Sequence, residues 1–349
     1  MAGGTGGHVF PALAVAETLR ERGCQVTWLG TRKGLEARVV PAADFTLDRI
    51  AVSGIRGKSL YRRLAAPFVL AIACVQAVWV FLKRRPQVVL GMGGFVSGPG
   101  GLVARVLGIH LVIHEQNRIP GTTNRWLARI ANKVLEAFPG SFPHNVGAIC
   151  TGNPLRRSLT RRIEDRANRG DGALRVLVVG GSQGARFLNE TVPAALAAMP
   201  DGVVLETWHQ TGAALRDATE ARYRQAGVPA RVDAFIEDMA EAYRWADVAV
   251  CRAGAMTVSE LAAAGLPAIF VPYPHAIDDH QTANARFVTE QGAGLCISQG
   301  DLDPERLASE LMRLNEDRSR LDLMGKRIHT LARIDAADRV ATLCMQEAA

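Results

Sequence analysis

The chain has 349 residues, of which 48% are hydrophobic, and this is enough for two α/β domains that each bury a core. The net charge of +7 is uneven, because residues 1–150 carry 18 Lys and Arg against 7 Asp and Glu, whereas residues 151–349 carry 23 against 27. This asymmetry predicts an anionic partner for the first half. The basic residues there are not interleaved with aromatic ones, so we expect an anionic lipid or a diphosphate and no nucleic acid.

Apolar runs alternate with helical stretches along the chain. The runs, each followed by loop residues, predict strands at residues 25–29, 87–90, 111–114, 174–179, 247–251 and 268–271, and a helical period predicts a helix over residues 11–21. The polar residues 160–172 predict a linker, after which the pattern starts again. This order is typical of two doubly wound, mostly parallel sheets, with a cleft between the two halves.

The cysteines and the start of the chain indicate the compartment. The six cysteines are scattered, with no CxxC pair and no Cys/His cluster, which argues against a disulfide framework or a zinc site and suits a reducing cytosol. No signal-peptide pattern opens the sequence, so we expect the chain to stay inside the cell.

Three glycine-rich loops stand at expected strand–helix junctions, at residues 3–8, 91–101 and 180–185. Backbone amides at the start of a helix suit a phosphate group, although one such loop could be a purely steric turn. The first loop begins at residue 2 without a strand before it, whereas such loops normally follow a strand. We therefore expect the natural chain to begin further upstream; the alternative is a first sheet without its central strand.

The first loop departs from the dinucleotide-binding fingerprint. Val9 stands where the third glycine of GxGxxG belongs, and Thr31 stands where an acidic residue would hold the ribose. Arg32 and Lys33 could hold a 2′-phosphate, which keeps an NADP-dependent oxidoreductase as a minor alternative. No GxxxxGK[ST] segment occurs, which excludes a P-loop NTPase.

Residues 64–82 form an uncharged apolar stretch between Arg62-Arg63 and Lys83-Arg84-Arg85. Its length alone would suit a transmembrane helix. Pro67 and Gln76 interrupt the stretch, and an expected strand follows within a few residues. We therefore expect a helix on the sheet whose exposed apolar residues touch an anionic membrane surface; a plain buried helix and a spanning helix are the alternatives.

Six motifs occur in a fixed order nearly from end to end. They are GGTGGHVFPALAVA (3–16), GMGGFVSGPGG (91–101), HEQN (114–117), GNPLR (152–156), GGSQGAR (180–186) and AMTVSELAAAGLP (255–267). This ordered set closely resembles the MurG family, the N-acetylglucosamine transferases that convert lipid I to lipid II in peptidoglycan synthesis.

The resemblance implies a GT-B fold of two Rossmann-like domains that face a cleft, and an inverting transfer without metal or cofactor. The expected domains are residues 1–155 for the lipid-linked acceptor and the membrane, residues 156–330 for UDP-GlcNAc, and a C-terminal helix over residues 331–349 that packs on the first domain. The implied partners are UDP-GlcNAc, lipid I, the anionic cytoplasmic face of the bacterial inner membrane and other cell-wall synthesis proteins, which would link a peripheral enzyme to cell shape and division.

The resemblance also assigns roles to individual residues. Glu260 looks like the carboxylate that accepts hydrogen bonds from both ribose hydroxyls; the minor alternative is that it complements a helix dipole. Ile236 lies at the position whose backbone contacts uracil in the family. Phe95 stands where a tyrosine is commoner in the family. The remaining donor-site candidates are Ala255, Met256, Thr257, Val258 and Ser259 at a helix start, Ser182 and Arg156 near the diphosphate, Gln281 and Asn117 near the sugar, and Thr5, Gly6 and Gly7 near the reacting pair.

An inverting transfer needs a base for the acceptor hydroxyl. His8 is the first candidate, with phosphate binding or helix capping as its alternative role. Glu115 is the rival base, or else it orients Asn117. His275, Asp278, Asp279 and His280 are interpreted as loop residues near the sugar.

The one DxD triplet, residues 301–303, could suggest a metal-dependent transferase. Asp303 followed by Pro304 is instead typical of a helix start. Helix dipoles and Arg156 would then have to stabilise the leaving diphosphate. Two other hypotheses remain: another GT-B member, such as a UDP-GlcNAc epimerase or an antibiotic glycosyltransferase, and a nucleotide-binding or scaffold protein without catalysis.

Overall fold

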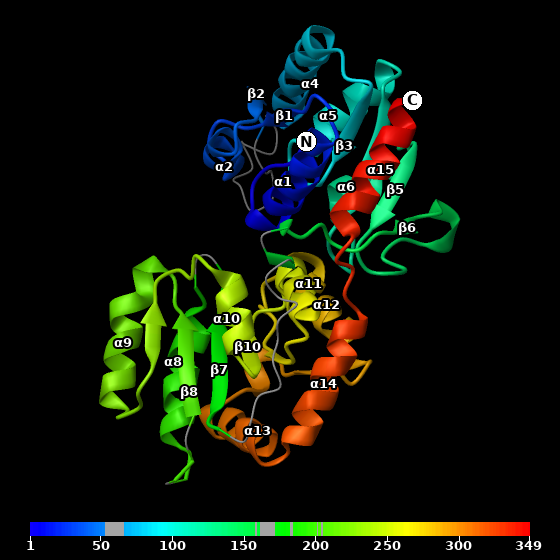
Figure 1. Ribbon diagram of the computed structural model, residues 1–349. Helices are drawn as coiled ribbons and strands as arrows, with labels where there is room; N and C mark the ends of the chain where they lie inside the picture. Colours follow the sequence, from blue (N-terminus) through cyan, green and yellow to red (C-terminus); the bar gives the residue numbers. More distant parts are fainter. Residues whose placement is uncertain (53–65, 158, 161–171, 182–183, 201, 204) are drawn as a thin grey trace. The chain divides into compact units, whose positions relative to one another are not determined.

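The computed structural model describes residues 1–52, 66–157, 159–160, 172–181, 184–200, 202–203 and 205–349. These residues form two compact units, shown in Figure 1. The first unit is Met1–Arg156 together with Arg333–Ala349, and the second unit is Arg157–Ala332. Nearly all of the expected linker at residues 160–172 lies outside the described residues.

The described strands of the first unit form two parallel sheets. One pairs β1 (Thr27–Gly30) with β2 (Thr46–Arg49), and the other has the order β3 (Val88–Gly91), β4 (His110–Glu115), β5 (Lys133–Glu136) and β6 (Ile149–Cys150). The helical segments are α1 (Gly6–Glu21), α2 (Glu36–Ala42), α4 (Ala66–Arg84), α5 (Ser97–Val106), α6 (Thr122–Leu127), the 3-10 turn η1 (His144–Val146) and α15 (Ala336–Ala348).

Met1 and Ala2 lie between the two sheets of the first unit. The Met1 nitrogen donates to the carbonyl of Leu90 at 2.7 Å, and the Met1 carbonyl accepts from the N–H of Met92 at 2.9 Å. On the other side, Nε1 of Trp28 in β1 donates to the Ala2 carbonyl at 2.9 Å. The first glycine-rich loop therefore starts beside the carboxyl end of β3 and leads directly into α1.

The last helix, α15, packs on α1 of the first unit (Figure 1). Val340, Ala341 and Cys344 share an apolar cluster with Val15 of α1 and Leu135 of β5. At the rim of this cluster, Arg22 pairs with Asp338 at 2.7 Å, and Lys133 pairs with Glu347 at 2.9 Å. The chain thus returns to the first unit after the second unit is complete.

The described strands of the second unit form one sheet, and every strand pair in it is parallel. Its order is β12 (Gly294–Cys296), β11 (Ala268–Phe270), β10 (Val248–Cys251), β7 (Leu174–Val179), β8 (Leu205–Gln210) and β9 (Arg231–Asp233). Counted along the chain, this is the Rossmann order 3-2-1-4-5-6 read from the opposite edge. The order reverses between β7 and β10, and such a switch point is where ligands bind at the carboxyl ends of strands.

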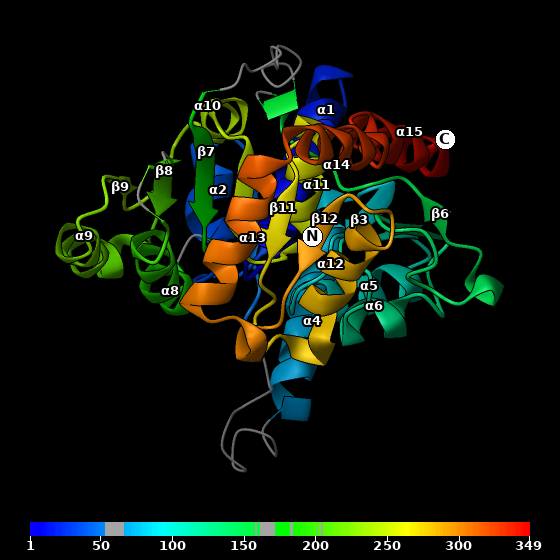
Figure 2. The ribbon, with the colours of Figure 1, turned by 90° about the horizontal axis from the view of Figure 1, so that it is seen from below.

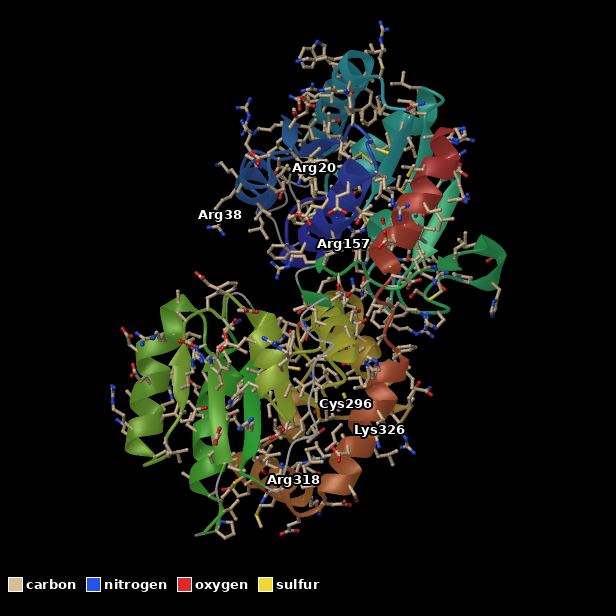
Figure 3. All side chains as sticks on the ribbon, viewed as in Figure 1. Arg20, Arg38, Arg157, Cys296, Arg318 and Lys326 are labelled. Carbon is tan, nitrogen blue, oxygen red and sulfur yellow. The ribbon has the colours of Figure 1, made fainter. Side chains whose placement is uncertain are left out.

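Helices cover the second sheet. They are α8 (Arg186–Ala197), η2 (Ala213–Leu215), α9 (Arg216–Gln225), α10 (Met239–Trp245), α11 (Ala255–Ala264), η3 (Ile277–Asp279), α12 (His280–Thr289), η4 (Gln299–Asp301), α13 (Pro304–Glu316) and α14 (Arg318–Thr330). Helices α8 and α13 lie side by side in Figure 2 and share the buried residues Leu188, Val192, Leu307 and Leu311. Arg318, labelled in Figure 3, lies 3.9 Å from Asp247 and donates to the Gly172 carbonyl, so it ties α14 to the start of β7 and β10.

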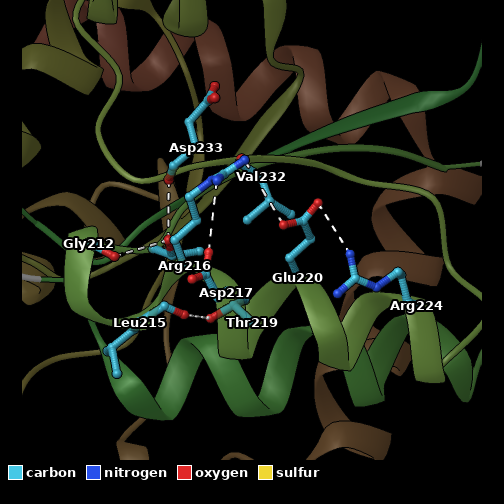
Figure 4. A network of polar contacts seen from close by, with 10 residues as sticks. Gly212, Leu215, Arg216, Asp217, Thr219, Glu220, Arg224, Val232 and Asp233 are labelled. Atoms are coloured by element: carbon cyan, nitrogen blue, oxygen red, sulfur yellow. Dashed lines mark hydrogen bonds and ion pairs between the residues drawn. The ribbon is translucent and has the colours of Figure 1, made fainter.

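Polar contacts cover the edge strand β9, as Figure 4 shows. Arg216 of α9 donates to the Val232 carbonyl at 3.5 Å and lies 4.0 Å from Glu220, which in turn lies 3.5 Å from Arg224. Exposed ion pairs of this kind contribute little to stability. They place charges beside the edge strand, which discourages pairing with another chain.

Candidate active site

A buried glutamate anchors the first glycine-rich loop. The Gly4 N–H donates to Oε2 of Glu36 at 3.0 Å, and Oε1 of Glu36 accepts from the N–H and the hydroxyl of Thr31 at 3.0 and 2.7 Å. Glu36 is fully buried. Because these donors satisfy both carboxylate oxygens, Glu36 fastens the loop to the end of β1.

His8 stands in the first turn of α1 and is half-buried. Its Nδ1 lies 2.7 Å from Oε1 of Gln116, which follows β4. The ring packs on Gly93 of the second glycine-rich loop, where a Cβ would come within 3.0 Å of the ring atoms Cε1 and Nδ1. Gly93 also has a φ of +86°, so both space and backbone conformation favour glycine here. His8 is thus held between two loops while part of its ring stays accessible.

The contact of His8 continues into the interior of the first unit. Nε2 of Gln116 lies 3.0 Å from Nδ1 of His114, and Nε2 of His114 lies 2.9 Å from the Gly152 carbonyl. His114 is fully buried. Burial lowers the pKa of His114 to about 4 and outweighs the opposing effects of the bond to Gly152 and the Glu115 charge. His114 is therefore neutral at physiological pH.

Glu115 accepts hydrogen bonds at both carboxylate oxygens. Oε1 accepts from the backbone N–H and the side-chain amide of Asn117 at 2.9 and 3.2 Å. Oε2 accepts from the Gly121 N–H at 3.0 Å and from Nδ2 of Asn124 at 2.8 Å. Glu115 is 1% exposed. This geometry favours the second of its two expected roles, in which Glu115 orients Asn117 and the loop after β4.

The other candidates of the first unit surround the start of α1. Thr5 is the N-cap residue of α1, but its side chain makes no capping hydrogen bond. Thr5 and Gly7 are exposed and Gly6 is half-buried. The guanidinium of Arg156 lies 5.2 Å from the ring centre of Phe10, which is also on α1. A positive helix end and an arginine therefore occur on the same part of the first unit, and this combination suits a phosphate.

In the second unit, Gln210 joins the third glycine-rich loop to Ile236. Its Nε2 donates to the Gly181 carbonyl at 3.2 Å, and its Oε1 accepts from the N–H of Ile236 at 3.0 Å. Gly184 has a φ of +75°, and a Cβ there would overlap the Thr211 carbonyl. Ser182, a candidate diphosphate contact, lies outside the described residues.

The start of α11 follows β10 at the switch point of the sheet. Gly254 is its N-cap residue and offers no side chain to cap the helix. Ala255 and Val258 point into the core, with exposed fractions of 6% and 2%. The half-buried candidates in this turn are Met256, Thr257 and Ser259. The first turn thus offers a positive helix end to a ligand, as a phosphate site requires.

Two aromatic residues contact the candidates for the ribose and the sugar. The Tyr243 hydroxyl donates to Oε2 of Glu260 at 2.7 Å, and Tyr243 is 1% exposed. Oε1 of Gln281 accepts from the Tyr273 N–H at 2.9 Å. The Tyr273 ring in turn lies 5.5 Å from the guanidinium of Arg252. Both candidates are therefore oriented by neighbours in the second unit.

The prediction that the DxD triplet begins a helix is confirmed. Asp303 is the N-cap of α13, Pro304 is its first residue, and Oδ1 of Asp303 accepts from the Arg306 N–H at 2.7 Å. In the expected loop cluster, Oδ1 of Asp279 accepts from the Thr282 hydroxyl at 2.6 Å. Within the described ranges, no group of three or more His, Cys, Asp or Glu side chains is placed to hold a metal ion.

Four residues that contact the candidates or their loops carried no expectation: Glu36, Gln116, Gln210 and Tyr243. Gln116 lies inside the HEQN motif, so the sequence indicates that its position matters but does not indicate its role. The other three are buried or nearly buried polar side chains, and no local pattern identifies their partners. Only the fold brings each of them to its partner.

Helix α4 has two different faces. One face packs into the core with Ala73, Ala77, Val80 and Phe81. The other exposes Phe68 (75%), Ile72 (53%), Val75 (70%), Trp79 (63%) and Leu82 (62%), which recur every three or four residues along one side. Among the described helices, α4 is the one that is long and apolar enough to cross a membrane. Residues 64 and 65 of the expected apolar stretch lie outside the described residues.

Comparisons with known proteins cover the whole chain. Residues 1–136 match the glycosyltransferase family 28 N-terminal domain, and residues 175–340 match its C-terminal domain. A protein of Methylococcus capsulatus named UDP-N-acetylglucosamine–N-acetylmuramyl-(pentapeptide) pyrophosphoryl-undecaprenol N-acetylglucosamine transferase is 59% identical over 348 residues, which cover 100% of this chain and 98% of that protein.

Solved structures agree with this match. The crystal structure of MurG from Acinetobacter baumannii is 41% identical, with a TM-score of 0.84 over 99% of this chain and 98% of that chain. A calicheamicin glycosyltransferase is 18% identical, with a TM-score of 0.67 over 99% of this chain and 97% of that one, and at this identity the likeness concerns the fold alone. The expected GT-B fold class is thereby confirmed.

Proposed function

The chain belongs to the MurG family within glycosyltransferase family 28, and from this premise we propose that it transfers N-acetylglucosamine from UDP-GlcNAc to lipid I. The acceptor would be the C4 hydroxyl of the muramyl sugar, and the product would be lipid II. The observation that carries the proposal is the 59% identity to a transferase of that name over the full length of the chain. The alternative hypotheses of an antibiotic glycosyltransferase or an epimerase have only fold-level likeness in their favour.

The second unit would bind the donor at its switch point. The first turn of α11 would hold the diphosphate, because a helix N-terminus without a side-chain cap is suited to an anion. Glu260, oriented by Tyr243, would accept hydrogen bonds from the ribose hydroxyls. Ile236 would meet the uracil through its backbone carbonyl, because its N–H already donates to Gln210. Gln281 would offer its amide group to hydroxyls of the sugar.

The first unit would bind the acceptor and supply the base. In the proposed reaction, His8 takes the proton of the C4 hydroxyl while that oxygen forms a bond to C1 of the donor sugar. The bond between C1 and the diphosphate oxygen breaks, and its electron pair leaves with UDP. Arg156 and the helix amides would stabilise the charge of the leaving group. Glu115, which already accepts four hydrogen bonds, would orient Asn117 instead of removing a proton.

We further propose peripheral binding to the cytoplasmic face of the bacterial membrane through the exposed side of α4. A stripe of large apolar residues on a helix that is otherwise packed in a core suits insertion at the interface of a bilayer. Lys83 and Arg85 at its end would attract anionic lipids, each by about 1 kcal/mol. Arg84 has a different role, because it makes two hydrogen bonds to Asp48 at 2.8 and 3.0 Å.

The direct test is transfer of labelled N-acetylglucosamine from UDP-GlcNAc to a short-chain lipid I analogue. A labelled product with the mobility of lipid II is expected, and UDP is released in equal amount. UDP-N-acetylgalactosamine serves as the donor control. If UDP-GlcNAc is consumed without lipid I, or if the chain has no affinity for uridine nucleotides, the proposed function is wrong.

A further inference from the structure

His8 lies at one end of a chain of three hydrogen bonds inside the first unit. The chain runs from Nδ1 of His8 to Oε1 of Gln116, from Nε2 of Gln116 to Nδ1 of His114, and from Nε2 of His114 to the Gly152 carbonyl, over distances of 2.7, 3.0 and 2.9 Å. Gln116 and His114 are 1% and 0% exposed, whereas His8 is half-buried. This series of hydrogen bonds therefore joins a buried carbonyl to a half-buried histidine.

The buried end determines which atoms donate. A carbonyl oxygen can only accept, so Nε2 of His114 must carry the hydrogen that is donated to Gly152. Burial lowers the pKa of His114 to about 4, so its ring is neutral near pH 7 and has a single N–H. Nδ1 of His114 must therefore accept its hydrogen bond from Gln116.

The side-chain amide of Gln116 has one favourable orientation. Its NH₂ group donates both to Nδ1 of His114 and to the backbone carbonyl of His114, each at 3.0 Å. If the amide were rotated by 180°, its Oε1 would face Nδ1 and the carbonyl oxygen of His114, which are both acceptors. Oε1 therefore faces His8, and an oxygen of this kind can only accept. It follows that Nδ1 of His8 carries a hydrogen.

We propose that Gln116 is a positioning residue that holds His8 in its Nδ1–H tautomer and leaves Nε2 of His8 as the atom that accepts a proton. The inference rests on the proposed function, in which His8 is the base for the acceptor hydroxyl. A neutral imidazole has one N–H, so a His8 ring with its hydrogen on Nε2 could not accept a proton at that atom. After proton transfer to Nε2, the Nδ1–H of His8 still donates to Gln116.

Three charged side chains of the first unit have partners of their own, and these contacts leave the assignment unchanged. Glu115 accepts three hydrogen bonds from Asn117 and Gly121 in the loop after β4 and one from Asn124 in α6, and Glu36 accepts from Gly4 and Thr31. Arg156 lies over the Phe10 ring. Within the described residues, the His8 ring is hydrogen-bonded to Gln116.

The first experiment reads the tautomer in the wild-type protein and uses one variant only to assign the signals. Protein labelled with ¹⁵N at the histidine rings is examined by NMR, and the His8 signals are assigned from their loss in His8→Gln. The expected result is a pyrrole-type nitrogen at Nδ1 and a pyridine-type nitrogen at Nε2 above the pH where the ring is protonated. The opposite pattern in the wild-type protein overturns the inference.

Two substitutions then separate tautomer control from simple support of the loop. Gln116→Leu removes the acceptor, so we expect a mixture of His8 tautomers, a loss of kcat of about 100-fold and a KM for UDP-GlcNAc within about twofold. Gln116→Glu keeps an acceptor oxygen that faces His8. Its second carboxylate oxygen, however, would face two acceptor atoms of His114, Nδ1 and the backbone carbonyl oxygen. This variant should therefore unfold more easily than Gln116→Leu and yet retain a higher kcat, because His8 keeps its tautomer. Gln225→Leu, at the exposed end of α9, is the control and should leave kcat and the ¹⁵N signals of His8 unchanged.

The outcomes distinguish this inference from the proposed function. If Gln116→Glu is less active than Gln116→Leu, Gln116 supports the loop and does not control the tautomer. If His8→Ala keeps its kcat, the proposed role of His8 as base is wrong. In that case the ¹⁵N signals of the wild-type protein still decide which nitrogen of His8 carries the hydrogen.

Discussion

The Tyr243 hydroxyl donates a 2.7 Å hydrogen bond to Oε2 of Glu260. A tyrosine that is almost completely buried on α10 thus orients a half-buried carboxylate on α11. Because Tyr243 belongs to the core, its hydroxyl is held in one place, and the carboxylate that we propose for ribose binding is oriented before the nucleotide arrives. Such preorganisation reduces the entropy lost on binding.

We therefore expect Tyr243→Phe to weaken donor binding. A hydrogen bond to a charged group contributes about 1.5–3 kcal/mol, so the KM for UDP-GlcNAc should rise by about tenfold to 100-fold while kcat stays within about twofold. Steady-state kinetics and titration with UDP measure this. Tyr223→Phe is the control, because it loses a hydrogen bond to His209 in the same unit and leaves Glu260 untouched. An equal rise in KM in both variants would show that the effect comes from general destabilisation.

Glu115→Gln should lower stability as well as activity. The substitution replaces one oxygen that accepts two hydrogen bonds with an NH₂ group that faces donors, and a buried unsatisfied donor costs about 1–3 kcal/mol. A fall in melting temperature of several degrees is therefore expected, followed by loss of kcat. His8→Ala should instead lower kcat by at least about 100-fold with little change in melting temperature. A fully stable but inactive Glu115→Gln would identify Glu115 as the base.

His209 makes stability depend on pH. Its Nδ1 accepts from the Tyr223 hydroxyl at 2.8 Å, its Nε2 donates to Oδ1 of Asn189 at 3.0 Å, and burial lowers its pKa to about 3. Between this value and the ordinary value near 6.5, the unfolded chain binds a proton that the folded chain does not. The contribution of the neutral, hydrogen-bonded His209 ring to the free energy of unfolding is therefore complete at neutral pH and is lost as the pH falls.

For His209 alone, the free energy of unfolding should fall by about 2 kcal/mol between pH 7 and pH 5. Urea unfolding at the two pH values measures this difference. His209→Gln has no ionisable ring and should be less stable at pH 7, with a correspondingly smaller fall between the two pH values. An equal fall in the wild-type protein and the variant would assign the acid sensitivity to other groups, such as His114.

Membrane binding should depend on the exposed side of α4. Trp79→Ser and Ile72→Ser remove large apolar side chains from the stripe, so binding to vesicles that contain anionic lipid should fall by about tenfold or more for each. Leu323→Ser, an exposed apolar residue on α14 of the second unit, is the matched control. Sedimentation with vesicles measures the bound fraction, and an unchanged fraction in all variants would place the membrane contact elsewhere.

Chelation of divalent cations should leave activity within about twofold of its normal value. Asp303 of the DxD triplet caps α13, and the proposed stabilisation of the leaving diphosphate relies on helix amides and an arginine. Initial rates with and without EDTA test this expectation. A large loss of rate that magnesium restores would show that the reaction needs a metal.

Several elements could be predicted from local patterns. The strand at residues 174–179 is found with the expected bounds, and the strand expected at residues 247–251 begins one residue later, at Val248. Buried parallel strands are continuous apolar runs, which makes them visible in a sequence. Shorter or more polar strands were missed, among them β5 (Lys133–Glu136) and β6 (Ile149–Cys150), because their pairing depends on neighbours in the sheet.

The sequence by itself determined the class of the protein. Apolar runs and glycine-rich junctions are local features that indicate two α/β domains without knowledge of the fold, and six ordered motifs carry the resemblance to the MurG family of glycosyltransferases. Only the tertiary structure decided which polar atoms meet. Gln116 lies 108 positions from His8 along the chain, and Tyr243 lies 17 positions from Glu260. Whether two polar atoms form a hydrogen bond depends on where the folded backbone places both residues. This position in space cannot be read from their separation in the sequence.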